Sequence, residues 1–267
     1  MTILTAARLL RVSSTSALLS SHWYYIAAAT LTACNQPQEL PKLYHYLMLT
    51  NASHTVTPTL EDANEAIVSA KAYQELSAEG SAMPLFPNSA AQLTVQQEQT
   101  NKIKDALLKA IALCGVPRVI NALMTLKTAT PSALRADELS VRATETDSAT
   151  IITERERGYK FWDQVYGKIN NRVAHQMSSA YPDLWTYTIN HIYGPLLSCT
   201  DVLSARESSL VIIACLVPQD VNPQLKGHLK GALNNGCTLE EIRAARELVI
   251  EISGWCGVSW RNDVAKL

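Results

Sequence analysis

The chain has 267 residues, of which 47% are hydrophobic and 18% are charged, and its formal net charge at pH 7 is -1. This is the composition of an ordinary globular protein, and the length is sufficient to bury one large core or two small ones. Because the sequence contains no excess or stripe of basic residues, nucleic acid is excluded as an expected partner.

Six cysteines are spread along the chain, and no two of them have the C-x-x-C spacing. A chain of this length and apolar content does not need a disulfide framework, so we expect a reducing compartment. Each cysteine is interpreted first as a small buried apolar residue. They are Cys34, Cys114, Cys199, Cys215, Cys237 and Cys256.

The first 38 residues contain no acidic side chain but include Arg8, Arg11 and several serines. This composition is typical of a mitochondrial presequence, and equally of a short amphipathic first helix. Residues 1–22 are therefore described as a presequence-like segment, and dual targeting to mitochondria stays open. The apolar run from Ile26 to Cys34 is interrupted and too short to span a membrane.

Residues 23–130 form the expected first part of the fold, with an insertion at 50–100. The insertion contains a predicted helix from Leu60 to Glu79 and a loop rich in Pro, Gly, Ser and Asn from Gly80 to Ser89.

Two segments of this first part resemble segments near the carboxyl end. Ala33-Cys34-x-x-Pro37 matches Ala214-Cys215-x-x-Pro218, and the run from Ile103 to Gly115 follows the spacing of Ile242 to Gly254. We interpret the similarity as an ancient duplication that has diverged.

A stretch rich in Thr, Ser, Ala and Asp separates the two predicted copies, and residues 131–153 are assigned to a linker. The second copy occupies 154–257 and begins with an aromatic-rich segment. No stretch of useful length alternates apolar and polar residues in the manner of a strand, so the fold is predicted to be all-α.

The stretch from Ser204 to Gly257 predicts three helices with recognisable ends. Ser204 and Glu207 have the spacing of a capping box, and Thr238 and Glu241 have it again. The middle helix is expected to start with Asn222 as its cap and Pro223 at its first position, and to stop at Asn235-Gly236.

His228 falls on the apolar face of the middle helix, in register with Leu225, Leu229 and Leu233. A histidine in this position is more often a hydrogen-bonded core residue than a functional one. A functional role therefore needs a second argument, and His45 in the first copy is interpreted as a residue kept for packing.

The second argument is a family resemblance. The segment from Pro223 to Ile242, with His228 and the run Asn234-Asn235-Gly236-x-Thr238, resembles the signature of carboxymuconolactone decarboxylases and their alkylhydroperoxidase D-like relatives. The resemblance is good over 159–257 and weak over 23–130. It implies an alkylhydroperoxidase D-like, all-helical fold with two degenerate repeats, and a homo-oligomer that is a trimer or a hexamer.

The resemblance leaves the chemistry open between two branches of the family. Alkylhydroperoxidase D-like members use a C-x-x-C pair and a glutamate, but the equivalent positions here are Val221, Gln224 and Ser209. A dithiol peroxidase needs a reactive thiolate and a nearby resolving thiol, which these positions do not supply. An oxidoreductase without the usual pair stays as one alternative, and a non-catalytic oligomeric scaffold stays as another.

Decarboxylase-type members keep the histidine and lack the cysteines, so the resemblance favours an enzyme that acts on a small carboxylated substrate. His228 would move the proton, because the pKa of a histidine lies near neutral pH. Arg206 and Asn234 are the candidate groups for holding the substrate carboxylate and enolate oxygens. Arg206 lies near a helix start, where a cation is unfavourable, so we expect it to have a partner. No nucleotide fingerprint or metal-ligand spacing occurs, and no cofactor is expected.

The last three residues, Ala265, Lys266 and Leu267, have the small-basic-leucine pattern of a peroxisomal targeting tripeptide. They predict a tail at 258–267 that is exposed to a peroxisomal import receptor, and the peroxisomal matrix as the location of the protein. The tripeptide and the presequence-like segment cannot be ranked from sequence.

Overall fold

The computed structural model describes residues 2–50, 57–86, 92–135, 141–142 and 147–267, and its regular elements are all helices. The prediction of an all-α fold is confirmed. In the described ranges no helix combines the length and the apolar character needed to cross a membrane. The helices are α1 (Ala6–Ser14), α2 (Trp23–Ala33), α3 (Leu40–Thr50), α4 (Leu60–Ala78), α5 (Leu93–Cys114), α6 (Val116–Lys127), α7 (Ser148–Tyr166), α8 (Asn170–Ala180), α9 (Pro182–Tyr187), α10 (Ala205–Leu216), α11 (Asn222–Asn234) and α12 (Leu239–Trp255).

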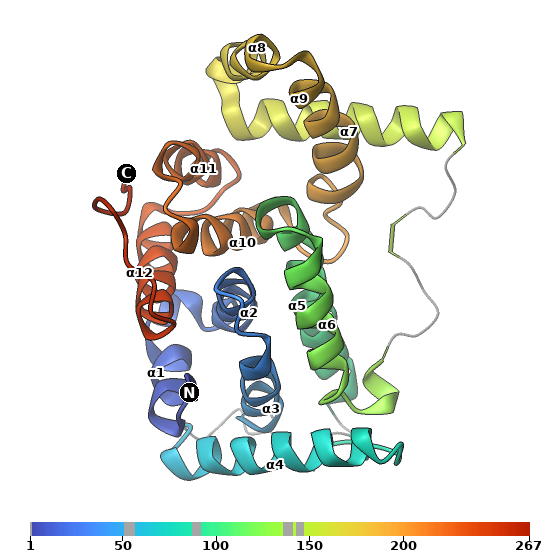
Figure 1. Cartoon of the computed structure of the whole chain (residues 1–267), viewed down its shortest axis with the longest axis vertical. Coiled ribbons are helices and arrows are strands. Elements are labelled where there is room, and N and C mark those ends of the chain that lie inside the picture. The colour runs from blue at the N-terminus through green and yellow to red at the C-terminus, as the bar shows by residue number, and fades with distance from the viewer. Residues whose placement is uncertain (1, 51–56, 87–91, 136–140, 143–146) are drawn as a thin grey trace.

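The two helices α2 and α10 form the centre of the molecule. Every residue of α2 is buried, and so is α10 from Glu207 onwards, as its apolar sequence predicts. They pack on each other, with α5 along one side and α12 along the other (Figure 1). Helices hydrophobic on all sides are stable only in such a central position.

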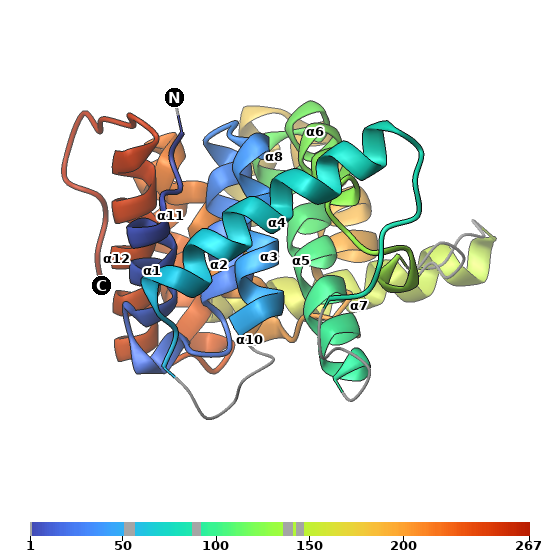
Figure 2. The same ribbon diagram turned by 90° about the horizontal axis from the view of Figure 1, so that it is seen from below.

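The amino-terminal segment is part of the folded body. Leu4, Leu9 and Val12 are buried, and the carboxylate of Glu39 accepts hydrogen bonds from the backbone N–H groups of Ile3 and Leu4. Helix α1 lies beside α4, which crosses the lower face of the molecule under α3 (Figure 2). Within the described residues 2–22, the segment forms α1 and a 3₁₀ turn at Ala17–Leu19, and both contribute buried side chains to the core.

The two halves of the chain share an order of elements. Helix α2 leads through a 3₁₀ turn at Pro37–Glu39 into α3, and α10 leads through a 3₁₀ turn at Val217–Gln219 into α11. The insertion of the first half contains α4, close to the predicted Leu60–Glu79. The predicted linker at 131–153 overlaps α7, which begins at Ser148, and 136–140 and 143–146 lie outside the described residues.

Both predicted capping boxes are present at the starts of α10 and α12. Gly236 ends the turn after α11 with φ of 90°, a value that favours glycine. The prediction that Asn222 caps α11 is wrong. Its side chain instead donates to the carbonyl of Asp263 and accepts from the N–H of Ala265, so it holds the tail.

The tail is docked on the body rather than fully exposed. The guanidinium of Arg246 donates to the carbonyls of Val264 and Ala265, at 2.6 and 2.7 Å, and Val264 is buried. The side chains of Lys266 and Leu267 remain exposed. Ser259 and residues 261–263 are exposed as well, so the expectation of an exposed tail fails mainly at Val264, which is buried, and at the half-buried Ala265 of the tripeptide.

Glycines allow the aromatic-rich segment to pack closely on itself and on α11. A Cβ atom at Gly158 of α7 would lie 2.7 Å from the backbone nitrogen of Gly194, in the π-helical segment η6 (Thr188–Leu197). A Cβ at Gly231 of α11 would lie 2.8 Å from the Val165 side chain. Helix α7 therefore has close contacts on two sides.

Substitution Gly158→Ala should lower the free energy of unfolding by about 1–2 kcal/mol, because overpacking against backbone outweighs the gain in helix propensity. Gly254→Ala in α12 is the matched control, since its new Cβ would meet nothing within 4 Å. The control should raise stability by up to about 1 kcal/mol. Urea unfolding of both variants measures their free energies of unfolding. Equal changes in the two variants would contradict the close approach of Gly158 to Gly194.

Candidate functional site

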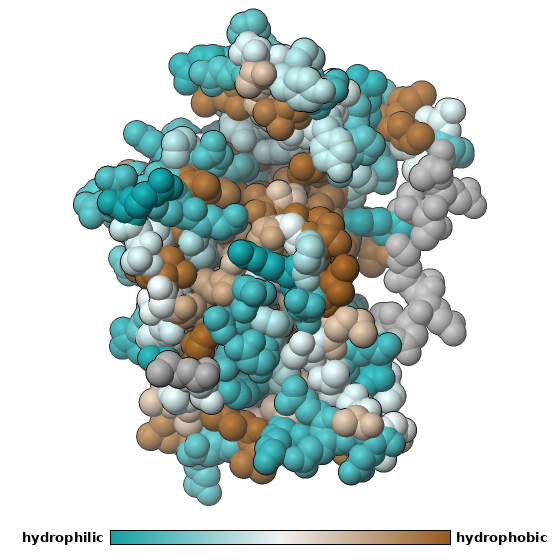
Figure 3. Space-filling model, in the orientation of Figure 1, coloured by the Kyte–Doolittle hydropathy of each residue, from teal (hydrophilic) through white to brown (hydrophobic). Residues whose placement is uncertain are grey.

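A cavity of about 470 Å³ lies beneath the upper layer formed by α7, α8, α9 and η6. Its floor comes from α11 and from the end of α5, and Figure 3 shows apolar residues gathered between this layer and the rest of the molecule. The lining is mostly apolar and aromatic, with a few polar groups, as is usual for a small-molecule site. It comprises Ala112, Leu113, Trp162, Tyr166, Val173, Gln176, Met177, Ala180, Leu184, Thr188, Ile192, Tyr193, Leu197, Gln224 and His228.

His228 lies at the cavity wall with one ring nitrogen bonded. Its Nε2 is 3.4 Å from the Tyr166 hydroxyl, and the Tyr193 hydroxyl donates to that of Tyr166 at 3.4 Å. Both distances are at the long end for hydrogen bonds. Since Tyr193 donates to Tyr166, the Tyr166 proton is available to Nε2, and the neutral ring then carries its own proton on Nδ1.

Burial controls the ionisation of this group of side chains. It lowers the pKa of His228 to about 4 and raises the pKa of Tyr193 well above its ordinary value. The imidazole is therefore neutral near pH 7 and can accept a proton, while both tyrosines stay protonated. A neutral imidazole beside hydroxyl donors is suited to general acid–base chemistry.

An aromatic wall fixes the two tyrosines. Trp162 lies against Tyr166, Trp185 and Tyr193, with ring centroids 4.1, 4.7 and 4.8 Å apart. The positions of the hydroxyls are thus set by ring packing between α7 and η6.

Arg206 and Asn234 are not among the residues that line the cavity. The Arg206 guanidinium pairs with the carboxylate of Glu241, which is the partner expected for a cation at a helix start. The Asn234 amide donates to the carbonyl of Val165 at 3.0 Å, near the end of α7. The structure therefore gives each residue a partner within the protein, and neither residue lines the cavity that contains His228.

His45 provides a useful contrast with His228. It is completely buried, its Nδ1 bonds the Ser69 hydroxyl, and its Nε2 bonds the carbonyl of Ala129, both at 2.9 Å. It also packs on Tyr73 and Phe86. Both ring nitrogens of His45 are used, whereas no described residue bonds Nδ1 of His228.

Of the residues that line the cavity, the sequence assigns only His228 to the site; Tyr166, Tyr193 and Gln224 are polar lining residues that it does not assign. The aromatic cluster was visible, but its role depends on η6, where the N–H of Ser198 bonds the carbonyl of Tyr193, five residues back. Such π-helical segments are rare and often occur at functional sites. The adjacent Gly194-Pro195 was the available signal, because proline removes a helical hydrogen-bond donor.

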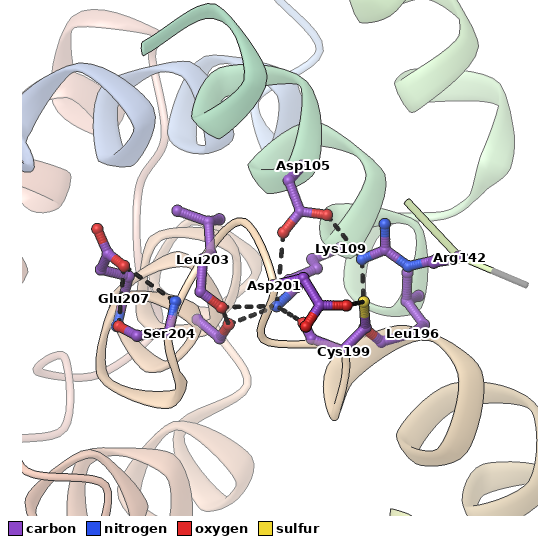
Figure 4. A network of polar contacts seen from close by, with 10 residues as sticks. Asp105, Lys109, Arg142, Leu196, Cys199, Asp201, Leu203, Ser204 and Glu207 are labelled. Carbon is purple, nitrogen blue, oxygen red and sulfur yellow. Dashed lines mark hydrogen bonds and ion pairs between the residues drawn. The ribbon is translucent and has the colours of Figure 1, made fainter. Parts of the chain in front are cut away.

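A polar network lies between α5 and the segment that leads into α10 (Figure 4). The buried ammonium of Lys109 donates to the carbonyl of Cys199 at 2.8 Å and to the hydroxyl of Ser208 at 2.5 Å. Asp105 lies 3.6 Å from Lys109 and 2.6 Å from Arg142. Each charge has partners in the protein, so this network is explained by the fold.

A larger hollow of about 780 Å³ lies between α5 and α6, and its lining includes Lys104, Lys127 and Arg135. It has cationic side chains, whereas the described lining of the His228 cavity has none, but Arg135 donates to the carbonyls of Thr130 and Lys127. Val202 is the one lining residue of this hollow that lies in the family-like region 159–257. In the described part of the chain, no cluster of three or more His, Cys, Asp or Glu side chains could hold a metal ion.

The fold and the site together define an all-helical protein with a neutral histidine in an aromatic cavity. Residues 184–266 match the carboxymuconolactone decarboxylase family, and this segment includes α11 and His228. The chain is 42% identical to Peroxisomal protein 2 of Saccharomyces cerevisiae, over 99% of each chain. It is 43% identical to Peroxisomal protein 2 of Schizosaccharomyces pombe, over 62% of this chain and 75% of the relative.

The chain therefore belongs to the carboxymuconolactone decarboxylase family. No solved structure matches it.

The His228 ring should stay neutral as the pH falls below 6.5 and take up a proton only near pH 4. An unfolded histidine is protonated near pH 6.5, so the unfolded chain binds more protons between pH 6.5 and 4. Folding stability should therefore fall as the pH drops through this window, and His45, whose pKa is also lowered to about 4, adds to the effect.

Titration of the histidine ring protons by nuclear magnetic resonance measures the pKa of His228, and the variant His228→Gln identifies its signal. A midpoint near 6.5 for His228 would show that the ring is solvated and would contradict its enclosure.

Proposed function

We propose that this chain is an enzyme in which His228 moves a proton to or from a small organic substrate held in the aromatic cavity. The observation that carries the proposal is the neutral imidazole at the cavity wall, with Nδ1 unbonded in the described structure and Nε2 bonded to Tyr166. A group that only packs would use both nitrogens, as His45 does.

The cavity favours a substrate that is mainly apolar and carries one carboxylate or carbonyl group. The hydroxyls of Tyr166 and Tyr193 can donate to a developing enolate oxygen once a substrate displaces their mutual bond. Gln224, one turn before His228, adds an amide to the same wall.

The described residues that line the cavity include no cationic side chain, and this supports decarboxylation over simple carboxylate binding. An unpaired carboxylate in an apolar site is costly. His228 first takes the proton of the substrate's carboxylic acid, and loss of carbon dioxide from the resulting carboxylate leaves a delocalised carbanion. The protonated His228 then returns that proton to the carbanion and becomes neutral again. In this proposal Arg206 and Asn234 support the helices around the site rather than contact the substrate.

The position of Gln224 argues against a thiol reaction in this cavity. Where the family resemblance places the second cysteine of the C-x-x-C pair, this chain has an amide that lines the cavity beside His228. The decarboxylase-like alternative is therefore preferred at this site over the alkylhydroperoxidase D-like one.

The substitution His228→Gln should lower turnover of a small lactone acid or β-keto acid by about 10²–10⁴-fold, the usual contribution of a general acid–base group. Carbon dioxide release and deuterium incorporation from heavy water, followed over a panel of such acids, provide the assay. His175→Gln, at an exposed position on α8, is the matched control and should retain full turnover. Equal turnover in the two variants would contradict the assignment.

We further propose that the protein works in the peroxisomal matrix, with Ala265-Lys266-Leu267 as the signal for an import receptor. The name Peroxisomal protein 2 of its relatives and the exposure of Lys266 and Leu267 support this. Deleting the three residues from a fluorescent fusion should abolish import into peroxisomes. Import that survives the deletion would contradict the signal, and mitochondrial fluorescence would favour the amino-terminal segment.

A homo-oligomer, trimer or hexamer, is also proposed from the family resemblance. Val116, Ile120 and Met124 form an exposed apolar row at one-turn spacing on α6, which a second copy of the chain could cover. A monomeric mass in light scattering would contradict this.

A further inference from the structure

The residues that follow α12, 258–267, form a strap that runs back beside α12 towards α11 (Figure 1). The indole N–H of Trp260 donates to the carbonyl of Val217 at 2.7 Å. The guanidinium of Arg261 donates to the carboxylate of Asp220 at 2.9 Å. Because Val217 and Asp220 lie in the turn between α10 and α11, this part of the strap ties the end of α12 to the start of α11.

The strap continues into the carboxyl-terminal tripeptide and holds its first residue. The backbone N–H of Ala265 donates to the side-chain oxygen of Asn222 at 2.7 Å, and the carbonyl of Ala265 accepts from the guanidinium of Arg246 at 2.7 Å. Val264 is buried, and its carbonyl accepts from the same guanidinium at 2.6 Å. Both main-chain polar groups of Ala265 are therefore used within the protein, whereas the last two residues of the chain are exposed.

This docking conflicts with the recognition of the tripeptide by a receptor. A protein that binds a short extended segment gains affinity from hydrogen bonds to the main chain and specificity from pockets for alternate side chains. In the docked strap the N–H of Ala265 is already donated, and its carbonyl is covered by a guanidinium that also holds Val264. A receptor would therefore reach only two of the three residues.

Asn222 and Arg246 hold the strap rather than the helices to which they belong. Asn222 donates to the carbonyl of Asp263 at 3.1 Å and accepts from the N–H of Ala265, so both ends of its amide are used on the strap. In the described part of the chain, both hydrogen bonds of the Arg246 side chain also go to the strap. Truncation of either side chain would remove two hydrogen bonds from the strap.

We propose that the docked strap is an autoinhibitory contact, and that the import receptor binds only the state in which residues 263–265 are released from Asn222 and Arg246. This inference rests on the proposed role of the carboxyl-terminal tripeptide as the import signal. A receptor that selects the released state binds with an apparent affinity lowered in proportion to the fraction of molecules in that state. Loss of contacts to the strap therefore raises the affinity.

The test is isothermal titration calorimetry of the full-length protein with the purified import receptor. Arg246→Ala and Asn222→Ala should each bind about 10-fold more tightly than wild type, since each variant loses two hydrogen bonds of the docked state. Arg243→Ala is the matched control, because Arg243 is exposed one turn earlier on α12. The control should bind as wild type does, and equal affinities of wild type and Arg246→Ala would overturn the proposal.

Digestion of the native protein with a carboxypeptidase tests the docking without the receptor. Cleavage that needs a released tail follows the population of that state, so the tail of Arg246→Ala should be trimmed past Ala265 about 10-fold faster than that of wild type. Mass spectrometry measures the rate, and Arg243→Ala should match wild type. Equal rates in wild type and Arg246→Ala would overturn the docked state.

A synthetic peptide of residues 258–267 separates this proposal from the proposed import signal. If the peptide binds the receptor and wild type binds as tightly as Arg246→Ala, the strap is not inhibitory, and the import signal stands. If the peptide does not bind the receptor, the import signal fails and this inference fails with it.

Discussion

The buried ammonium of Lys109 is the constraint on which the arrangement of the two halves depends. The side chain is 1% exposed, and burial lowers its pKa despite Asp105 nearby. Burying such a charge is costly unless every donor finds an acceptor, and the acceptors here are carbonyls of Cys199 and Leu203 and the hydroxyl of Ser208. The segment that leads from η6 into α10 therefore has to follow the path that satisfies this lysine.

That path sets the geometry of the cavity. Helix α5, which carries Lys109, also provides Ala112 and Leu113 to the cavity lining, and η6 provides Tyr193. The close approach of Gly158 to Gly194 then brings α7 and its Tyr166 against Tyr193. The site is thus assembled from elements distant in sequence. The hydrogen bonds of Lys109 hold α5 against the segment that follows η6, and the close approach of Gly158 to Gly194 holds α7 against η6.

Local patterns were sufficient for much of the fold. The capping boxes at Ser204 and Thr238, the turn at Gly236 and the all-helical class follow from short-range rules of propensity and hydrogen bonding. The face of His228 followed from helical periodicity, and Gln224 shares that face one turn earlier. These features depend on residues within about one or two helical turns, where sequence spacing determines spatial proximity.

Features that depend on distant partners could not be predicted in the same way. Arg206 and Asn234 are close in sequence to the family-like motif, but Glu241 and Val165 satisfy them. Asn222 has the residue type of a helix cap, yet its amide binds the tail.

The central claim is that His228 faces a cavity that a small molecule can enter, whereas His45 does not. Diethyl pyrocarbonate modifies neutral imidazoles, so the most direct measurement is its rate of reaction with each histidine of the native protein, read by peptide mapping. The account predicts that His228 reacts and His45, with both nitrogens bonded in the core, is protected. Equal protection of the two rings would contradict an accessible site at His228.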